Sequence, residues 1–546
     1  MIVAASSGNE SGGLWTFFKK ENRRALLFCL LMTSGPILYG YDGTLLAETA
    51  FKRDYGYLVS GAGATATYAY TSTNQSLWTS IIQVGEVFGS LSAGFVGDKG
   101  GRKGAALVAI ILVTIGVVIQ MVKNISALLT VGRLIIGLGI GMISNTVPLY
   151  LSEIPPAHLR GVAVSSWQLM LAIGQVIGAC VGYGAETLDN KAAYLIPMGI
   201  NLVFVLLIGV ALLIVPESPR WLLYRGREDK AVRALERIHG GTEMKEILVQ
   251  EQLAILNKSR EEELAATEGA ASKWSDLLFN KVERRKAICV IGILVSQQIS
   301  GVQFIFSYTT TFFQLVGIDD AFTITIVVDC LEVFGVLCSF LIVNRFGRRP
   351  LLLWSAVFMM ITLLMVGVLG AVAGHGDFSD YLADHKALGQ AIAAMICLYV
   401  WAFNLVWGPL AWAVASEMST GRNRQKSMSI GTACFWVVAW ATTFTLPYLF
   451  NKEEAGLGPM IGFIYAFGAL LSILFVYFCI PETSGRTLEE INFMFEAGIP
   501  TREWARYDLA TVVAKDEKKG MRFAGTTEHF EGEKAMPLKR SDSLTA

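Results

Sequence analysis

The sequence predicts an all-α membrane protein with twelve transmembrane helices, arranged as two six-helix bundles with a cytoplasmic helical segment between them. Composition is the first observation behind this prediction. Of the 546 residues, 53% are hydrophobic and only 16% are charged, whereas soluble domains usually carry about a quarter charged residues. Lys plus Arg and Asp plus Glu both number 45, so there is no basic excess to bind the phosphates of a nucleic acid.

Apolar stretches long enough to cross a bilayer are the second observation. A spanning helix needs about 20 predominantly apolar residues. Most of the glycines lie inside these stretches, as is typical of membrane helices. The predicted spans cover about residues 25–47, 77–97, 104–122, 127–150, 161–184, 193–215, 287–316, 321–343, 350–374, 388–415, 427–450 and 460–480.

An internal repeat of polar motifs is the third observation. Each half carries three motifs in the same order, after its second, fourth and sixth spans. In the middle motif, Glu153 precedes Arg160 by seven residues, and Glu417 precedes Arg424 by the same spacing. Parallel repeats of six spans predict two bundles with a site between them near the midplane, as in an alternating-access carrier. The other two motifs occupy residues 97–103 and 344–349, and residues 216–220 and 481–486.

A polar stretch with helical runs rich in Glu, Lys and Leu divides the spans into two groups of six. Lys and Arg near the span ends are concentrated in the short loops on one side, which marks that side as cytoplasmic. Both termini are therefore expected in the cytoplasm. The predicted organisation is an N-terminal tail (1–24), a first bundle (25–215), a linker (216–286), a second bundle (287–481) and a C-terminal tail (482–546).

Three motifs carry a resemblance to a known family. They are Pro-Glu-Ser-Pro-Arg-Trp-Leu at 216–222, Gln-Gln-Ile-Ser-Gly at 297–301 and Gly-Pro-Leu-Ala-Trp at 408–412. With twelve spans in the same order, the chain resembles the sugar porter family of the major facilitator superfamily, and fungal members in particular. The resemblance implies the major facilitator fold and sugar transport without a cofactor or a metal ion.

The resemblance also implies a cytoplasmic gate of charged residues. Ion pairs across the ends of the bundles would hold the outward-open state shut on the inside and break when the carrier opens inward. Asn344 stands where an acid is usual and Lys103 where Arg is common, so the C-terminal copy of the latch is expected to be weaker. The gate residues are Asp98, Arg102, Glu153, Arg160, Glu217, Arg220, Arg348, Arg349, Glu417, Arg424 and Glu482.

Ionisable residues inside the predicted spans are candidates for function because they are costly in a membrane. They are Asp42, Glu86, Arg133, Asp329 and Glu332. A paired Asp42 and Arg133 would keep the acid ionised, and separation would let it bind a proton. The resemblance places a proton-coupling acid at Asp42. A static buried ion pair is the alternative for this pair, and for Glu86 a structural role stands level with a functional one.

Neutral amides and aromatic rings form the expected substrate site. Amides both donate and accept hydrogen bonds, although they also commonly join membrane helices. The resemblance assigns sugar contacts to Gln168, Gln297, Gln298, Trp412 and Trp436.

Two departures from the family bear on the substrate. Gln303 and Glu332 stand where the family has Asn. Glu332 is interpreted as a hydrogen-bond acceptor for sugar hydroxyls or as a second proton site. Because an acid repels a carboxylated sugar, a neutral sugar is favoured.

The expected function is proton-coupled uptake of a neutral sugar, with hexoses or pentoses favoured, by a monomer in the plasma membrane. The expected partners are the sugar, the proton and the lipid bilayer, without nucleic acid. A transporter-like sugar sensor, or a facilitative carrier of sugars, polyols or disaccharides, are the alternatives. An enzyme is not expected, because the chain shows no P-loop, no His-Glu-x-x-His and no nucleophile elbow with partners.

Overall fold

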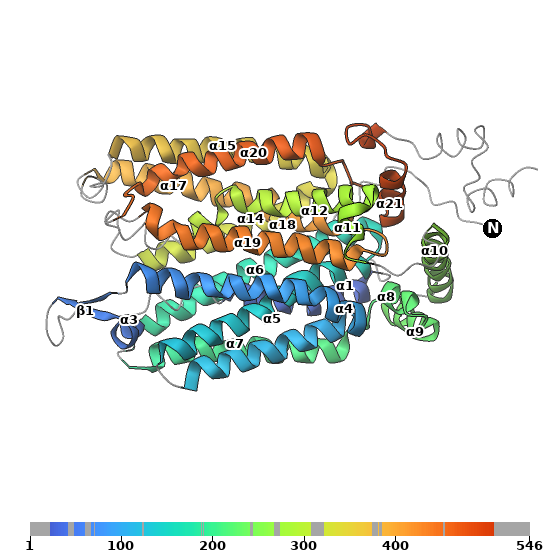
Figure 1. The fold of residues 1–546 in the computed structure, drawn as a ribbon, viewed down its shortest axis with the longest axis horizontal. Coiled ribbons are helices and arrows are strands. Elements are labelled where there is room, and N and C mark those ends of the chain that lie inside the picture. Colours follow the sequence, from blue (N-terminus) through green and yellow to red (C-terminus); the bar gives the residue numbers. More distant parts are fainter. Residues whose placement is uncertain are drawn as a thin grey trace, which may run out of the picture.

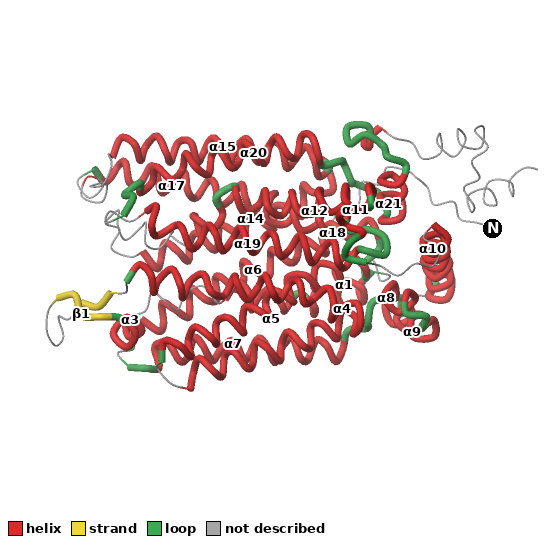
Figure 2. The backbone as a smooth tube through the Cα atoms, viewed as in Figure 1, coloured by secondary structure: helices red, strands yellow, loops and turns green. Residues whose placement is uncertain are grey.

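Long helices dominate the protein and run roughly parallel to one another (Figures 1 and 2). The ribbon comes from a computed structural model. It describes residues 22–41, 49–60, 67–69, 71–122, 125–186, 188, 190–240, 244–266, 273–306, 321–373, 381, 385–450 and 454–506. Asp42, one of the predicted site residues, lies outside this part of the chain.

The first half contains the first six predicted spans. Gly101 has φ 78° and ψ −173°, so the chain turns there and the long α4 comprises the second and third spans. The first span is divided at Thr33 into α1 and α2. The helices are α1 (Arg23–Met32), α2 (Ser34–Tyr41), α4 (Ser72–Val122), α5 (Ser126–Glu153), α6 (Ala157–Glu186) and α7 (Ala192–Ile214).

The second half contains the other six spans. A turn at Ser300 and Gly301 interrupts the seventh span, which is helical again over residues 302–306. A π-helical segment, η4, interrupts the tenth. The elements are α12 (Lys281–Ile299), α14 (Ala321–Phe346), α15 (Arg348–Ala373), α17 (Lys386–Ala402), η4 (Phe403–Trp407), α18 (Gly408–Met418), α19 (Arg424–Phe450), η5 (Gly458–Ile461) and α20 (Gly462–Cys479).

Ten helices in the described residues are long and apolar enough to cross a membrane. One of them, Ser76–Val122, contains two of the predicted spans, and the divided first span adds another. The twelve-helix architecture is therefore consistent with the structure, and the predicted membrane fold is confirmed.

Short helices gather at one end of the bundles, called the linker end below, as Figure 1 shows for α8, α9, α10 and α21. In α8, Ser218 accepts a hydrogen bond from the Trp221 N–H and Pro219 opens the helix, a common way to begin a helix. The elements are α8 (Pro219–Tyr224), α9 (Glu228–Ile238), α10 (Lys245–Ala266), α11 (Asp276–Phe279), α21 (Leu488–Glu496) and η6 (Trp504–Arg506).

A small β-ribbon lies at the opposite end, called the ribbon end below (Figure 1). It follows α3 (Thr49–Tyr55) and pairs β1 (Tyr57–Ser60) antiparallel with β2 (Thr67–Ala69). The all-α prediction missed this ribbon. Its Tyr, Val and Thr residues favour extended backbone.

Glycines bring α4 and α5 into backbone contact around Glu86. A Cβ on Gly85 would lie 2.2 Å from the Leu134 carbonyl oxygen, and one on Gly137 would lie 2.1 Å from that of Ile82. Only glycine fits such an approach, which is a common way for membrane helices to pack. The close packing expected around Glu86 is therefore present.

Candidate functional site

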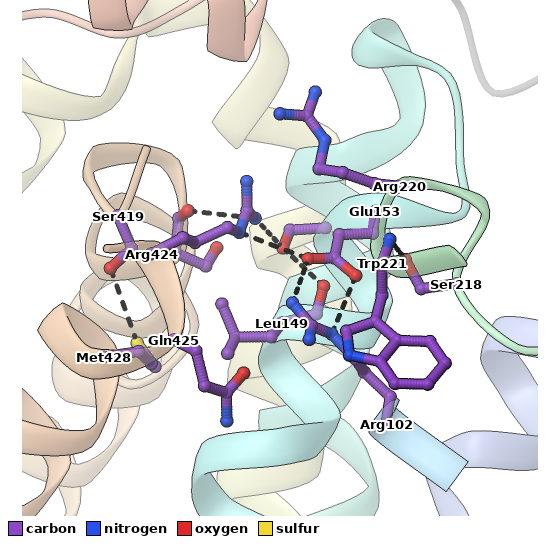
Figure 3. A network of polar contacts seen from close by, with 12 residues as sticks. Arg102, Leu149, Glu153, Ser218, Arg220, Trp221, Ser419, Arg424, Gln425 and Met428 are labelled. Atoms are coloured by element: carbon purple, nitrogen blue, oxygen red, sulfur yellow. Dashed lines mark hydrogen bonds and ion pairs between the residues drawn. The ribbon is translucent and has the colours of Figure 1, made fainter. Parts of the chain in front are cut away.

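A buried carboxylate, that of Glu153 at the end of α5, joins the two bundles at the linker end. Arg102 of α4 donates to it from Nε at 3.0 Å and from Nη2 at 2.7 Å. Arg424, the first residue of α19 in the second half, places its Nε 3.4 Å from Oε1 of the same carboxylate. Figure 3 shows both guanidinium groups at Glu153. One acid therefore pairs with a cation from each bundle.

The first turn of α19 makes further polar contacts with the first bundle. Lys426 Nζ lies 3.2 Å from Asp98 Oδ2, and Gln425 Nε2 donates to Asn145 Oδ1 at 2.8 Å. The approach depends on Gly97, where a Cβ would lie 2.7 Å from Gln425 Nε2. Together with the Glu153 contacts, these bonds close the linker end in this conformation.

Glu217 and Glu482 hold matching turns in the two halves. Glu217 accepts hydrogen bonds at 3.0 and 3.1 Å from the backbone N–H groups of residues 102 and 103. Glu482 accepts the equivalent bonds at 2.9 and 3.0 Å from residues 348 and 349. Burial raises the pKa of the Glu217 carboxyl above its usual value, although the backbone N–H donors act in the opposite direction. Both predicted gate acids thus bind main chain, and neither forms an ion pair with a cation side chain among the described residues.

Each of these turns begins with a glycine in the left-handed region. Gly101 has φ 78° and Gly347 has φ 79°. A Cβ would meet the Oε2 of Glu217 at 2.3 Å in the first case and that of Glu482 at 2.7 Å in the second. The two glycines therefore let the carboxylates reach the backbone.

Glu417 is the second-half counterpart of Glu153, and it is bound more loosely. Arg348 Nη2 lies 3.5 Å from its Oε1, and the Thr483 hydroxyl donates to its Oε2 at 2.6 Å. Among the described residues, no cation of the first bundle lies within 4.0 Å of it. That the C-terminal copy is the weaker latch stays a prediction.

The remaining predicted gate arginines bind other partners. Arg160 donates from Nε to the Ser152 carbonyl oxygen at 2.9 Å, and Arg349 donates from Nη2 to the Tyr477 carbonyl oxygen at 2.8 Å. Arg220 pairs with Glu489 of α21. The sequence analysis missed Glu489, which lies outside the repeated motifs.

A polar cluster around Glu332 of α14 lies where α14 and η4 of the second bundle meet α6 of the first. Gln168 of α6 donates from Nε2 to Glu332 Oε1 at 3.2 Å and to Asn404 Oδ1 at 3.0 Å. With its amide oriented by the hydrogen-bond network, Gln175 donates to both carboxyl oxygens of Glu332, at 3.1 and 2.9 Å. The carboxylate therefore accepts hydrogen bonds from two amides of the opposite bundle.

The predicted amides of the seventh span lie next to the tenth. Gln297 donates from Nε2 to the carbonyl oxygens of Trp407 and Gly408, at 3.0 and 3.2 Å. Gln297 and Gln298 are 3% and 2% exposed, and their Oε1 atoms have no hydrogen-bond partner among the described residues. Gln303 is half-buried in the short helical segment that follows Gly301. The two amide oxygens are thus buried acceptors, and each has room for a donor.

Aromatic rings connect the bundles beside these amides. The ring of Trp412 lies 5.4 Å from that of Trp167, and the ring of Trp436 meets that of Tyr39 edge-on at 5.2 Å. Trp436 Nε1 also donates to the Ser144 hydroxyl at 3.1 Å. Both predicted tryptophans therefore contact first-half helices.

The predicted proton-coupling pair is placed only in part. Arg133 is buried in α5, and Asp42 lies outside the described residues. Glu86 is buried in α4. Tyr39 lies near enough to interact electrostatically with both Glu86 and Glu332.

Four residues of the central site were missed by the sequence analysis, and two of them had a readable signal. Gln175 follows Gln168 by two helical turns, which places both on one face of α6. Asn404 precedes Gly408 and Trp412 at a spacing of four, again one face of a helix. Tyr39 and Trp167 carried no signal beyond being aromatic.

These observations define the class of the protein. It is a multi-pass membrane protein whose two helix bundles enclose amides, aromatic rings and a buried acid, and are tied together at one end. Such a centre offers donors, acceptors and flat apolar surfaces to a polar, uncharged small molecule.

Comparison with known sequences identifies the family. A sequence profile described as "Sugar (and other) transporter" matches residues 28–495. The match covers most of the chain, so the protein belongs to this transporter family. The resemblance to sugar porters is thereby confirmed.

Curated relatives of similar length agree with this assignment. The chain is 32% identical over 504 residues to the major facilitator-type transporter ecdD of Aspergillus rugulosus, which covers 91% of each chain. It is 31% identical over 510 residues to the low-affinity glucose transporter HXT3 of Saccharomyces cerevisiae, which covers 90% of this chain and 87% of the relative.

Solved structures share the fold. The proton:xylose symporter XylE bound to 6-bromo-6-deoxy-D-glucose matches with a TM-score of 0.69 and 24% identity, over 87% of this chain and 100% of that one. An inward-open structure of XylE from E. coli matches with a TM-score of 0.62 and 22% identity, over 86% of this chain and 99% of that one.

Proposed function

We propose that this protein takes up a neutral sugar together with protons by alternating access, with hexoses or pentoses favoured. The observation that carries the proposal is the pair of buried amide oxygens on Gln297 and Gln298, which have no partner among the described residues. A sugar hydroxyl is a donor that satisfies such an oxygen, and it is also an acceptor for an amide N–H. Trp412 supplies a ring face for the C–H surface of the sugar.

The closed linker end supports alternating access. Contacts that cross between the bundles there include Glu153 with Arg424, Asp98 with Lys426, and Gln425 with Asn145. These contacts must break before the linker end opens. We assign the linker end to the cytoplasmic side of the plasma membrane, with both termini on that side. The carrier is assigned as a monomer. The sugar then enters from the ribbon end.

Acids in the centre favour a neutral cargo. Glu332 and Asp329 are both buried in α14, and a negative charge on the sugar would be repelled by either acid in its ionised form. Uncharged hydroxyls instead meet amides and rings. A carboxylated sugar is therefore disfavoured relative to its neutral parent.

Proton coupling is assigned to Asp42 and Arg133. Arg133 is buried in α5, and a buried guanidinium needs an acid to balance it. When the pair separates during the cycle, the carboxylate loses its cation and binds a proton. XylE, which shares the fold, is a proton:xylose symporter, and this is in keeping with the assignment.

Uptake of radiolabelled sugars in transporter-null cells tests the proposal. A panel of hexoses, pentoses, disaccharides and uronic acids is measured with and without a protonophore. We expect accumulation of at least one neutral monosaccharide, which the protonophore abolishes. In D42N we expect uphill accumulation to be lost while sugar exchange continues. Sugar entry that only equilibrates would indicate a facilitative carrier, and sugar binding without transport would indicate a sensor.

A further inference from the structure

Glu332 is the acid that links the two bundles at the centre of the molecule. Its side chain is fully buried, with 0% exposure. Both of its carboxyl oxygens accept hydrogen bonds from Gln168 and Gln175 of α6, which belongs to the other bundle. Any movement of one bundle against the other at this level must change these bonds.

The surroundings of Glu332 contain acids and neutral groups. Asp329 lies one turn earlier on the same helix, and Tyr39 of α2 lies near both Glu332 and Glu86 of α4. In the part of the chain that the structure describes, no Lys, Arg or His nitrogen lies within 4.0 Å of Glu332. α15, α17 and α18 also pack on α14, and their described residues form no ion pair with Glu332.

An ionised carboxyl in such surroundings is costly, because burial removes water and no cation replaces it. Amide donors offset only part of this cost. A proton removes the charge, and it also changes the number of hydrogen bonds that the group accepts. An ionised carboxylate accepts at both oxygens, whereas a protonated one donates from one oxygen and accepts mainly at the other.

We propose that Glu332 is a second proton-binding group of the carrier, and that its protonation releases the Gln168 amide to the sugar. The inference rests on the proposed function and adds to it a coupling group separate from Asp42. A proton from solution binds one carboxyl oxygen of Glu332, and the hydrogen bond from the Gln168 amide across the bundles is lost. The freed Gln168 N–H then donates to a sugar hydroxyl. When sugar and proton leave, the Gln168 amide returns to the carboxylate.

The order of events predicts a pH-dependent affinity for the sugar. Sugar affinity is high where Glu332 is protonated and low where it is ionised, because the ionised acid competes for the Gln168 amide. In E332Q the side chain keeps its shape and can no longer gain or lose a proton. All variants of this test also carry D42N, so that Asp42 does not titrate. D42N alone should keep a pH-dependent sugar affinity, and the affinity of E332Q in this background should be independent of pH.

The test is exchange of radiolabelled D-glucose in vesicles that have the same pH on both sides, so that no proton gradient drives transport. Between pH 5 and pH 8 we expect the KM of D42N to rise about tenfold, the size of one hydrogen bond to a charged group. In E332Q the KM should stay constant. The same rise in E332Q overturns the inference. Absence of D-glucose exchange in the wild type contradicts the proposed function instead.

Two further variants keep the test decisive. D329N removes the neighbouring acid on the same helix and should retain the pH-dependent KM. The pH at the midpoint of the KM change should be the same or lower, because a like charge is gone. E332D keeps a titratable group and should also retain the pH-dependent KM. If E332Q does not exchange sugar, equilibrium binding of radiolabelled D-glucose to the purified variant at pH 5 and pH 8 replaces the exchange measurement. Equal affinities support the inference, and a tenfold difference overturns it.

Discussion

The two halves of the molecule carry the same acid at the linker end, but they bind it differently. Glu153 of the first half accepts two donors from Arg102 and lies 3.4 Å from Arg424 of the other half. Glu417 of the second half has Arg348 at 3.5 Å and the Thr483 hydroxyl. Arg160, like its counterpart Arg424, donates to a carbonyl of its own segment, but among the described residues no acid of the other half lies within 4.0 Å of Arg160. Only one of two matched arginines therefore crosses to the other bundle as an ion-pair partner.

The difference shows that a repeated motif can keep its local turn while only one copy forms an ion pair with the other bundle. The first-half acid balances two buried cations, so it is central to closing the linker end. The second-half acid balances one cation loosely and takes a hydroxyl as its other donor. Closure in this conformation thus depends on the first-half acid far more than on its copy.

The largest expected effect is that of E153Q. This change leaves Arg102 and Arg424 buried without their shared acid, and removal of one partner of a buried pair costs about 3–5 kcal/mol. We expect the linker end to open and net uptake to fall by at least about tenfold. The distance between spin labels placed at Lys99 and Arg345 measures the opening.

The matched control is E417Q. It removes one ion pair of 3.5 Å, so we expect a much smaller shift in the spin-label distance and in uptake. Equal effects of E153Q and E417Q would contradict the asymmetry between the halves.

The next largest effect distinguishes the two arginines. R424Q removes the cation that crosses between the bundles and leaves Glu153 with Arg102 alone. It also removes the hydrogen bond from Arg424 Nη2 to the Ser152 hydroxyl, and a hydrogen bond from a charged group contributes about 1.5–3 kcal/mol. R160Q removes a hydrogen bond within one half and a weaker, longer-range attraction to Glu417 and Glu489 of the other half. We expect R424Q to widen the spin-label distance and R160Q to leave it near the wild-type value. A wider opening in R160Q than in R424Q would show that the crossing contact is not the important one.

A smaller difference is expected between the two turn glycines. G101A and G347A both force a side chain into a backbone conformation that favours glycine, at a cost of about 1–3 kcal/mol. G101A should be the more destabilising, because its Cβ meets Glu217 at 2.3 Å where that of G347A meets Glu482 at 2.7 Å. Thermal unfolding in detergent measures both.

Gly100 provides the control for the glycine variants. A Cβ there meets nothing within 4 Å, so G100A should leave the unfolding temperature unchanged or raise it slightly. If G100A lowered the unfolding temperature as much as G101A does, disruption of the helix, and not the turn geometry at Gly101, would explain the effect.

The smallest effect concerns Arg220 and Glu489. Burial tends to raise the pKa of the Glu489 carboxyl, but Arg220 beside it lowers the pKa below its usual value. Its stabilising contribution is therefore present above the ordinary carboxyl pKa of about 4.3 and is lost as the pH falls further. The pair is partly exposed, so we expect less than about 1 kcal/mol. The difference in unfolding temperature between the wild type and E489Q should close as the pH falls below about 4, and a constant difference would contradict this account.

The architecture could be predicted from the sequence because it depends on long patterns. Twelve apolar stretches and the repeated spacing of Glu153 with Arg160 and Glu417 with Arg424 are each read along the chain. The spacing indicated which acids and arginines lie at one end. It could not indicate which arginine crosses, since both copies have the same spacing and the choice depends on how the bundles meet.

The central site was only partly readable for a similar reason. Gln168 and Glu332 were recognised as candidates, but their contact joins residues from different bundles. Glu489 pairs with Arg220 although more than 260 residues separate them. Such pairings follow from the packing of the halves, and no local periodicity records them. The β-ribbon was missed because its strands are only four and three residues long.

The carboxylates of Glu217 and Glu482 have a consequence for how freely this sequence can change. They hold main-chain N–H groups, which every residue except proline offers. Positions 103 and 349 can therefore carry Lys in one half and Arg in the other while the turn remains the same. After an internal duplication, mutation could alter the charged side chains that follow each glycine without disrupting the hydrogen bonds that hold the turn. The two halves could in this way diverge at the membrane surface while they kept the same turn.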